Sequence, residues 1–61
     1  MYVARDKGGD LYLFQKRPRK CDNLHVWLEE CINMIKLDSS LFPEVSWEDE
    51  EPTEVELVKK L

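Results

Sequence analysis

Two short runs of strand-forming residues flank a pair of glycines near the start of the chain. The runs are Tyr2–Arg5 and Leu11–Phe14, and both are rich in aromatic and aliphatic side chains. Gly8 and Gly9 lie in the polar segment between them, and glycine readily adopts the positive φ angles that tight hairpin turns require. This pattern predicts a β-hairpin over residues 1–17.

The side chains of a strand alternate between its two faces. This rule separates Tyr2 and Ala4 from Val3 and Arg5 in the first run, and Leu11 and Leu13 from Tyr12 and Phe14 in the second. A two-stranded hairpin is only marginally stable in water by itself. Further strands are therefore expected to join its two open edges.

The middle of the chain, residues 23–37, fits two patterns. Apolar residues at Leu24, Leu28, Cys31 and Ile35 recur at helical spacing, and Asp22 or Asn23 is a suitable N-cap. The same segment also alternates at strand spacing, through Leu24, Val26 and Leu28 and again at Ile35 and Leu37. Two strands joined near residues 29–30 are favoured because the hairpin needs more sheet, and a helix at about 23–36 is the alternative.

Prolines interrupt the segments on either side of this middle region. Residues 15–20 contain Pro18, which cannot donate to a central ladder, so a strand end that runs into a solvated loop is expected there. Residues 38–43 begin with an N-cap cluster, Asp38 to Ser40, and Pro43 limits them to a single helical or 3₁₀ turn.

The end of the chain returns to an extended pattern. Ser46 and Trp47 are expected to be extended, and an acidic loop follows over residues 48–52. Residues 53–59 alternate well enough for a last strand with Val55 and Leu57 facing inward. No linker or repeat divides the chain.

These elements predict a mainly β fold, formed by a small antiparallel sheet of about four to five strands with one short helical turn near 38–43. An α+β fold with a central helix is the alternative. A chain of 61 residues forms one domain, 1–61, and buries only about 60% of the surface that its unfolded form exposes. Extra stabilisation from a partner or from self-association is therefore expected.

Charge is unevenly distributed along the chain. The net charge is −4, yet residues 1–20 carry six basic and two acidic side chains, whereas residues 21–61 carry three basic and eleven acidic ones. Such polarity bears on the choice of partner. The charged start is unlike a signal peptide and no apolar segment is long enough to span a membrane, so a cytoplasmic location is expected and no membrane partner.

Cys21, His25 and Cys31 are the soft metal ligands of the chain. A structural zinc site almost always takes four ligands, and a nucleophilic cysteine needs a cleft and an orienting group. The favoured interpretation is two free, structural thiols, with a disulfide or a metal as the alternative. We therefore expect no enzyme activity, no metal and no cofactor.

Two charged segments are the candidate interaction sites. The basic one comprises Lys16, Arg17, Arg19 and Lys20, which lie close in sequence to aromatic residues. The acidic one comprises Glu48, Asp49, Glu50 and Glu51, and it follows Trp47. Trp47 is expected in the core, but it would be the leading interface residue if it were exposed. The acidic overall balance makes nucleic acid an unexpected partner.

The two ends of the chain carry the patterns of a known group of proteins. The segment Met1–Phe14, MYVARDKGGDLYLF, and the segment Leu41–Leu57, LFPEVSWEDEEPTEVEL, resemble the ends of small uncharacterised proteins from bacterial phages and mobile elements. The resemblance covers roughly half of the chain and leaves out its cysteines. It implies no activity, but it does imply a protein that acts stoichiometrically on a host protein.

The leading hypothesis is a phage-type binding module that engages an unidentified host protein, and inhibits it, through the acidic loop or the open edge of the hairpin. The same kind of open strand edge would allow a homodimer. The first alternative is an acidic nucleic-acid mimic that occupies the basic groove of a nucleic-acid-handling enzyme. The second is a metal- or thiol-dependent enzyme.

Overall fold

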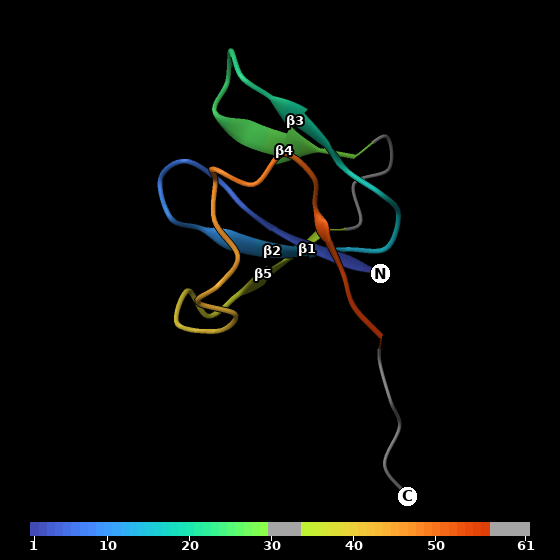
Figure 1. The fold of residues 1–61 in the computed structure, drawn as a ribbon. Helices are drawn as coiled ribbons and strands as arrows, with labels where there is room; N and C mark the ends of the chain where they lie inside the picture. Colours follow the sequence, from blue (N-terminus) through green and yellow to red (C-terminus); the bar gives the residue numbers. More distant parts are fainter. Residues whose placement is uncertain (30–33, 57–61) are drawn as a thin grey trace, which may run out of the picture.

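The computed structural model describes residues 1–29 and 34–56, and these residues form a mainly β structure (Figure 1). Within them no helix occurs, and six strands are arranged in two antiparallel sheets. The strands are β1 (Tyr2–Arg5), β2 (Leu11–Phe14), β3 (Arg19–Cys21), β4 (Val26–Leu28), β5 (Met34–Leu37) and β6 (Thr53–Glu54). The mainly β class predicted from the sequence is therefore confirmed.

The predicted hairpin is the centre of the larger sheet. β1 and β2 pair from Tyr2 opposite Phe14 to Arg5 opposite Leu11. The turn is closed by a hydrogen bond of 2.9 Å from the Gly9 amide to the Asp6 carbonyl, and Gly9 has a φ of 98°, a conformation that suits glycine.

Both edges of this hairpin are at least partly covered by other strands. The strand order of the larger sheet is β5-β2-β1-β6, so β5 covers the edge of β2 and β6 covers part of the edge of β1. The hairpin therefore offers less free strand edge than the sequence suggested, and whether that edge engages a partner stays a hypothesis. The edges of the larger sheet belong instead to β5 and β6.

The basic segment contains a strand that the sequence did not predict. Arg19–Cys21 forms β3, which pairs with β4 in a second, two-stranded sheet, and Pro18 just before it is buried. Prediction of a solvated loop over 15–20 was therefore wrong at its end. Proline is compatible with this strand because it precedes the ladder and does not belong to it.

The middle of the chain forms strands, as favoured from the sequence. β4 begins at Val26. Leu24, which the strand pattern included, lies in the preceding turn and is exposed. β4 and β5 do not pair with each other: β4 joins the smaller sheet and β5 the larger one. The junction expected near residues 29–30 runs into residues 30–33, which lie outside the described residues, together with Cys31.

Apolar side chains pack on both faces of the hairpin. One cluster consists of buried Val3, Leu11 and Val45 with partly buried Leu13, Leu37, Phe42 and Val55 around them. The other consists of buried Ala4, Phe14 and Trp27 with partly buried Tyr2, Tyr12 and Trp47. The alternation predicted for the two hairpin strands is confirmed, and β1 and β2 form the inner layer of the fold.

Trp27 fastens the smaller sheet to the larger one. Its indole Nε1 donates a hydrogen bond of 3.0 Å to the Arg5 carbonyl, and its backbone amide donates one of 3.0 Å to Asp6 Oδ1. These bonds tie β4 to the end of β1. In Figure 1 the smaller sheet consequently lies above the hairpin.

A long loop with several short turns follows β5. The amides of Leu41 and Val45 donate to the carbonyls of Asp38 and Phe42, which closes two separate turns. The single helical or 3₁₀ turn expected near 38–43 is present as one turn closed between Asp38 and Leu41, without a helix. The extended stretch expected at Ser46 and Trp47 is wrong, because the Asp49 amide bonds to the Ser46 carbonyl at 3.1 Å and closes a further turn.

This loop is held by a side chain from the hairpin. The Arg5 guanidinium donates to backbone carbonyls of Gly9, Ser39, Leu41, Phe42 and Val45 at 2.7–3.2 Å. After the acidic loop, β6 pairs with β1, and Val55 packs inward as predicted. Leu57, also expected to face inward, lies outside the described residues.

Candidate interaction surfaces

Within the basic segment, the side chain of Lys20 contacts the backbone of the acidic loop. Its Nζ donates to the carbonyl oxygens of Trp47 and Asp49, the latter at 2.8 Å. The same ammonium group lies 4.4 Å from the ring centroid of Trp47 and 5.5 Å from that of Trp27. Lys20 is therefore a structural cation that fastens the acidic loop to β3, and it is not free for a partner.

Trp47 belongs partly to the core. It is half-buried and packs edge-on against Trp27, with the ring centroids 6.4 Å apart and the planes at 79°. His25 lies at its other side in a similar edge-on arrangement, at 6.3 Å. The expected core role of Trp47 fits this position.

The acidic loop combines internal contacts with exposed carboxylates. Asp49 Oδ2 accepts a hydrogen bond of 3.1 Å from the Ser46 amide, which fixes the start of the loop. Glu48, Glu50 and Glu51 are exposed and line a shallow acidic hollow together with Asp49 and Thr53. Among the four acidic candidates, Asp49 is thus the one whose side chain accepts a hydrogen bond within the loop.

Arg17 and Glu51 connect the basic segment with the end of the acidic loop. Arg17 Nη2 lies 3.2 Å from Glu51 Oε1, and both side chains are largely exposed. The Arg17 guanidinium also lies 5.9 Å from the Tyr2 ring centroid. An exposed ion pair of this kind contributes little to stability, but it places opposite charges side by side.

A basic pocket of about 330 Å³ lies next to this ion pair. Its lining residues are Lys16, Arg17, Arg19, Leu28 and Glu29. Glu29 Oε1 accepts a hydrogen bond of 2.8 Å from the Lys16 amide, whereas its Oε2 is buried and has no hydrogen-bond partner among the described residues. The pocket therefore presents three cationic side chains around the aliphatic side chain of Leu28.

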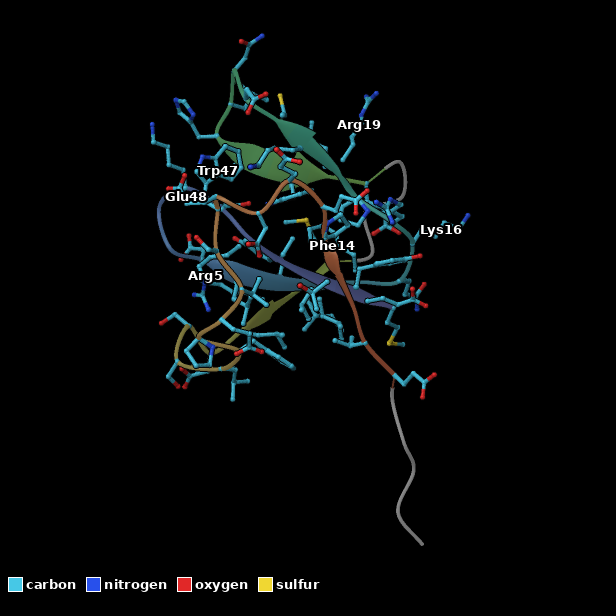
Figure 2. All side chains as sticks on the ribbon, viewed as in Figure 1. Arg5, Phe14, Lys16, Arg19, Trp47 and Glu48 are labelled. Atoms are coloured by element: carbon cyan, nitrogen blue, oxygen red, sulfur yellow. The ribbon has the colours of Figure 1, made fainter. Side chains whose placement is uncertain are left out.

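The structure divides the predicted site residues into two groups. In Figure 2 Lys16 and Arg19 extend from one side of the molecule, whereas Trp47 and Glu48 lie on the other. Leu28 and Glu29 were not predicted as site residues. The missing signal was the pairing of β3 with β4, which sets Arg19 directly opposite Leu28.

The described residues assemble no metal site. Cys21 is a free, half-buried thiol in β3, and His25 is exposed in the turn before β4. Within residues 1–29 and 34–56, no three His, Cys, Asp or Glu side chains lie close enough to hold a metal ion. Cys31, the third member of the predicted ligand group, lies outside these residues.

Two carboxyl groups in turns have shifted pKa values. Burial raises the pKa of Asp6 above its ordinary value of 3.8; the hydrogen bond from the Trp27 amide opposes this shift, and nearby Asp10 adds to it. Hydrogen bonds from the Ser40 amide and hydroxyl lower the pKa of exposed Asp38. Both groups shape turns, and neither lies in the basic pocket.

No protein-family model, curated protein or solved structure matches this chain. Over the part of the chain that is described, no helix has the length and apolar character needed to cross a membrane.

Proposed function

We propose that the protein acts by stoichiometric binding to another protein, without chemistry of its own, and that the basic pocket is the surface it uses. The observation that carries this proposal is the composition of the pocket. Lys16, Arg17 and Arg19 surround an exposed part of Leu28 in one concavity. Such a mixture of cations and aliphatic surface is typical of protein interfaces, where arginine is enriched.

The pocket suits an acidic segment that also carries an apolar side chain. Carboxylates of the partner would bind the exposed Lys16 and Arg19, neither of which forms an ion pair among the described residues. The apolar side chain would cover Leu28. Arg17 would exchange its exposed contact with Glu51 for the partner at little cost. Inhibition of a host protein, as the resemblance of the two chain ends suggests, would follow if that segment belongs to its working surface.

Affinity capture with a charge-reversed pocket tests this proposal. The purified protein is immobilised and exposed to a lysate of the cell in which it is naturally made. Wild type should retain a protein in near-equimolar amount, and the double variant Lys16→Glu, Arg19→Glu should bind that protein at least about tenfold more weakly. Isothermal titration with the purified partner gives the stoichiometry.

The matched control reverses a charge of the same sign elsewhere. Lys7→Glu changes an exposed residue of the hairpin turn that does not line the basic pocket, so it should retain the partner. If the pocket variant and the control retain the same proteins in the same amounts, the pocket is not the binding surface and the proposal fails.

The exposed carboxylates of Glu48, Glu50 and Glu51 favour a second candidate, a mimic of a nucleic-acid backbone. In that case the partner would be a nucleic-acid-handling enzyme with a basic groove. The triple change to glutamine should then abolish capture, salt should weaken binding steeply, and the Lys16→Glu, Arg19→Glu variant should still bind. The opposite pattern supports the basic pocket.

A further inference from the structure

β5 forms one edge of the larger sheet. It pairs with β2 over four successive residues, from Leu11 opposite Leu37 to Phe14 opposite Met34. Among residues 1–29 and 34–56, no strand pairs with its outer side. The outward-pointing amides and carbonyls of such an edge are a template for another strand.

The two edges of this sheet differ in how well they are protected. β6 is only two residues long, follows Pro52 and ends in Glu54, and all three features discourage pairing by a further strand. β5 contains no proline, and its pairing with β2 is uninterrupted. Its single charge, Lys36, lies 3.6 Å from Asp10 of the hairpin turn and is thereby engaged within the molecule.

β5 also exposes apolar side chains on both of its faces. Ile35 is 59% exposed and Met34 is 42% exposed. Ile35 lies opposite Leu13 and Met34 opposite Phe14, and these β2 residues belong to the two clusters on opposite faces of the hairpin. A strand added beside β5 would therefore extend both apolar layers at once.

We propose that β5 of a second copy of this chain pairs with β5 in antiparallel fashion, which joins two four-stranded sheets into one. This surface is separate from the basic pocket, so the inference does not depend on the proposed function. The strand is self-complementary: it brings apolar residues for both faces and no unengaged charge. In addition, residues 1–29 and 34–56 contain only three fully buried large side chains, Val3, Leu11 and Phe14, and a small domain gains stability from association.

Charge fixes the register of this pairing. A two-fold axis normal to the sheet keeps its faces continuous, so a central residue of β5 lies opposite its own copy. With Lys36 on the axis, two ammonium groups would face each other, which is unfavourable. With Ile35 on the axis, two isoleucines meet, and Met34 lies opposite Lys36 of the second copy.

The oligomeric state of the full chain tests this inference. Sedimentation at increasing protein concentration should show a reversible monomer–dimer equilibrium. Ile35→Glu would place two carboxylates at the axis and should raise the dimer dissociation constant at least about tenfold. Leu24→Glu, which alters an apolar residue of similar exposure in the turn before β4, should leave that constant unchanged. A wild-type chain that stays monomeric at every concentration overturns the inference.

Disulfide cross-linking tests the same pairing if the Ile35→Glu variant does not fold. In a chain with Cys21→Ser and Cys31→Ser, Ile35→Cys should form a disulfide-linked dimer under mild oxidation, because residues opposite each other across antiparallel strands lie within disulfide reach. Leu24→Cys in the same background should stay monomeric. Equal cross-linking of the two variants, or none at Ile35→Cys, contradicts the proposed pairing.

Discussion

Arg5 engages all five of its guanidinium N–H groups with backbone carbonyl oxygens. Four of its five acceptors lie 34 to 40 residues away in sequence, in the loop after β5. These contacts hold a loop that has no ladder of its own, including Phe42 with its positive φ of 48°. A non-glycine residue persists in that conformation only when its surroundings impose it.

We expect Arg5→Lys to lower the free energy of unfolding by at least about 2 kcal/mol, because an ammonium group cannot reproduce five diverging hydrogen bonds. Urea denaturation followed by circular dichroism measures the change. Arg19→Lys, at an exposed position in β3, is the matched control and should stay within about 0.5 kcal/mol of wild type. Equal stability of Arg5→Lys and wild type would show that the carbonyl cluster does not hold the loop.

Asp6 gives stability a defined pH dependence. Its pKa is raised in the folded state, so between 3.8 and that higher value the folded chain binds more protons than the unfolded one. The contribution of Asp6 to stability therefore falls as pH rises through this window and stays lower above it. Asp6→Asn keeps an acceptor for the Trp27 amide and removes a partly buried charge, so it should raise the urea midpoint slightly at neutral pH.

Asp38 provides the opposite sign as a comparison. Its pKa is lowered by Ser40, so its contribution is present above 3.8 and is lost as pH falls through the lower folded-state value. Asp38→Asn should consequently lower the midpoint at neutral pH. A lower midpoint for Asp6→Asn as well would mean that the charge of Asp6 stabilises the turn.

At the scale of elements, the sequence predicted those elements whose residues are adjacent in the chain. The hairpin could be predicted because its strands and its glycine turn are adjacent in sequence. β3 could not be predicted, because Arg19–Cys21 is a basic tripeptide that becomes a strand only by pairing with β4, where Trp27 lies opposite Lys20. The contacts that hold the loop after β5 could not be predicted for a related reason: Arg5 from β1 binds its first part, up to Val45, and Lys20 from β3 binds its second part.

The acidic loop is expected to depend on a single lysine of β3. Lys20→Met keeps the aliphatic stem but removes two hydrogen bonds and the contacts with two indole rings. It should cost about 1–2 kcal/mol of stability and shift the NMR signal of the Trp47 indole N–H. Lys16→Met, which alters a neighbouring exposed lysine, should do neither. An unchanged Trp47 signal in Lys20→Met would contradict the proposed role of Lys20.

At the scale of the whole molecule, the fold mixes charges that are separated in the sequence. Arg17 forms an ion pair with Glu51, and Lys20 donates a hydrogen bond to the Asp49 carbonyl, so the basic first third contacts the acidic last third. Lys36 forms an ion pair with Asp10 in the hairpin turn. The sequence indicated two electrical ends, yet opposite charges adjoin in the structure. Which charges meet could not be predicted, because the contacts depend on how the two sheets are joined.

Exposed ion pairs should contribute little to this arrangement. Arg17→Gln and Glu51→Gln are each expected to change the free energy of unfolding by less than about 0.5 kcal/mol, because both partners are solvated. Urea denaturation at low and high salt measures the change. A loss as large as that of Lys20→Met would show that the Arg17–Glu51 pair is a structural contact.

The apolar pattern of the hairpin does not by itself fix the register of its two strands. In an ordinary sheet a slip of one strand by one residue exposes its apolar side and is penalised at once. Here apolar side chains pack on both faces of β1 and β2, so such a slip would move apolar side chains from one apolar cluster into the other. What a slip does destroy is the position of Arg5, which would turn away from its carbonyls. Arg5, the most hydrophilic side chain of β1, is thus the one that holds the strands of the two apolar layers in register.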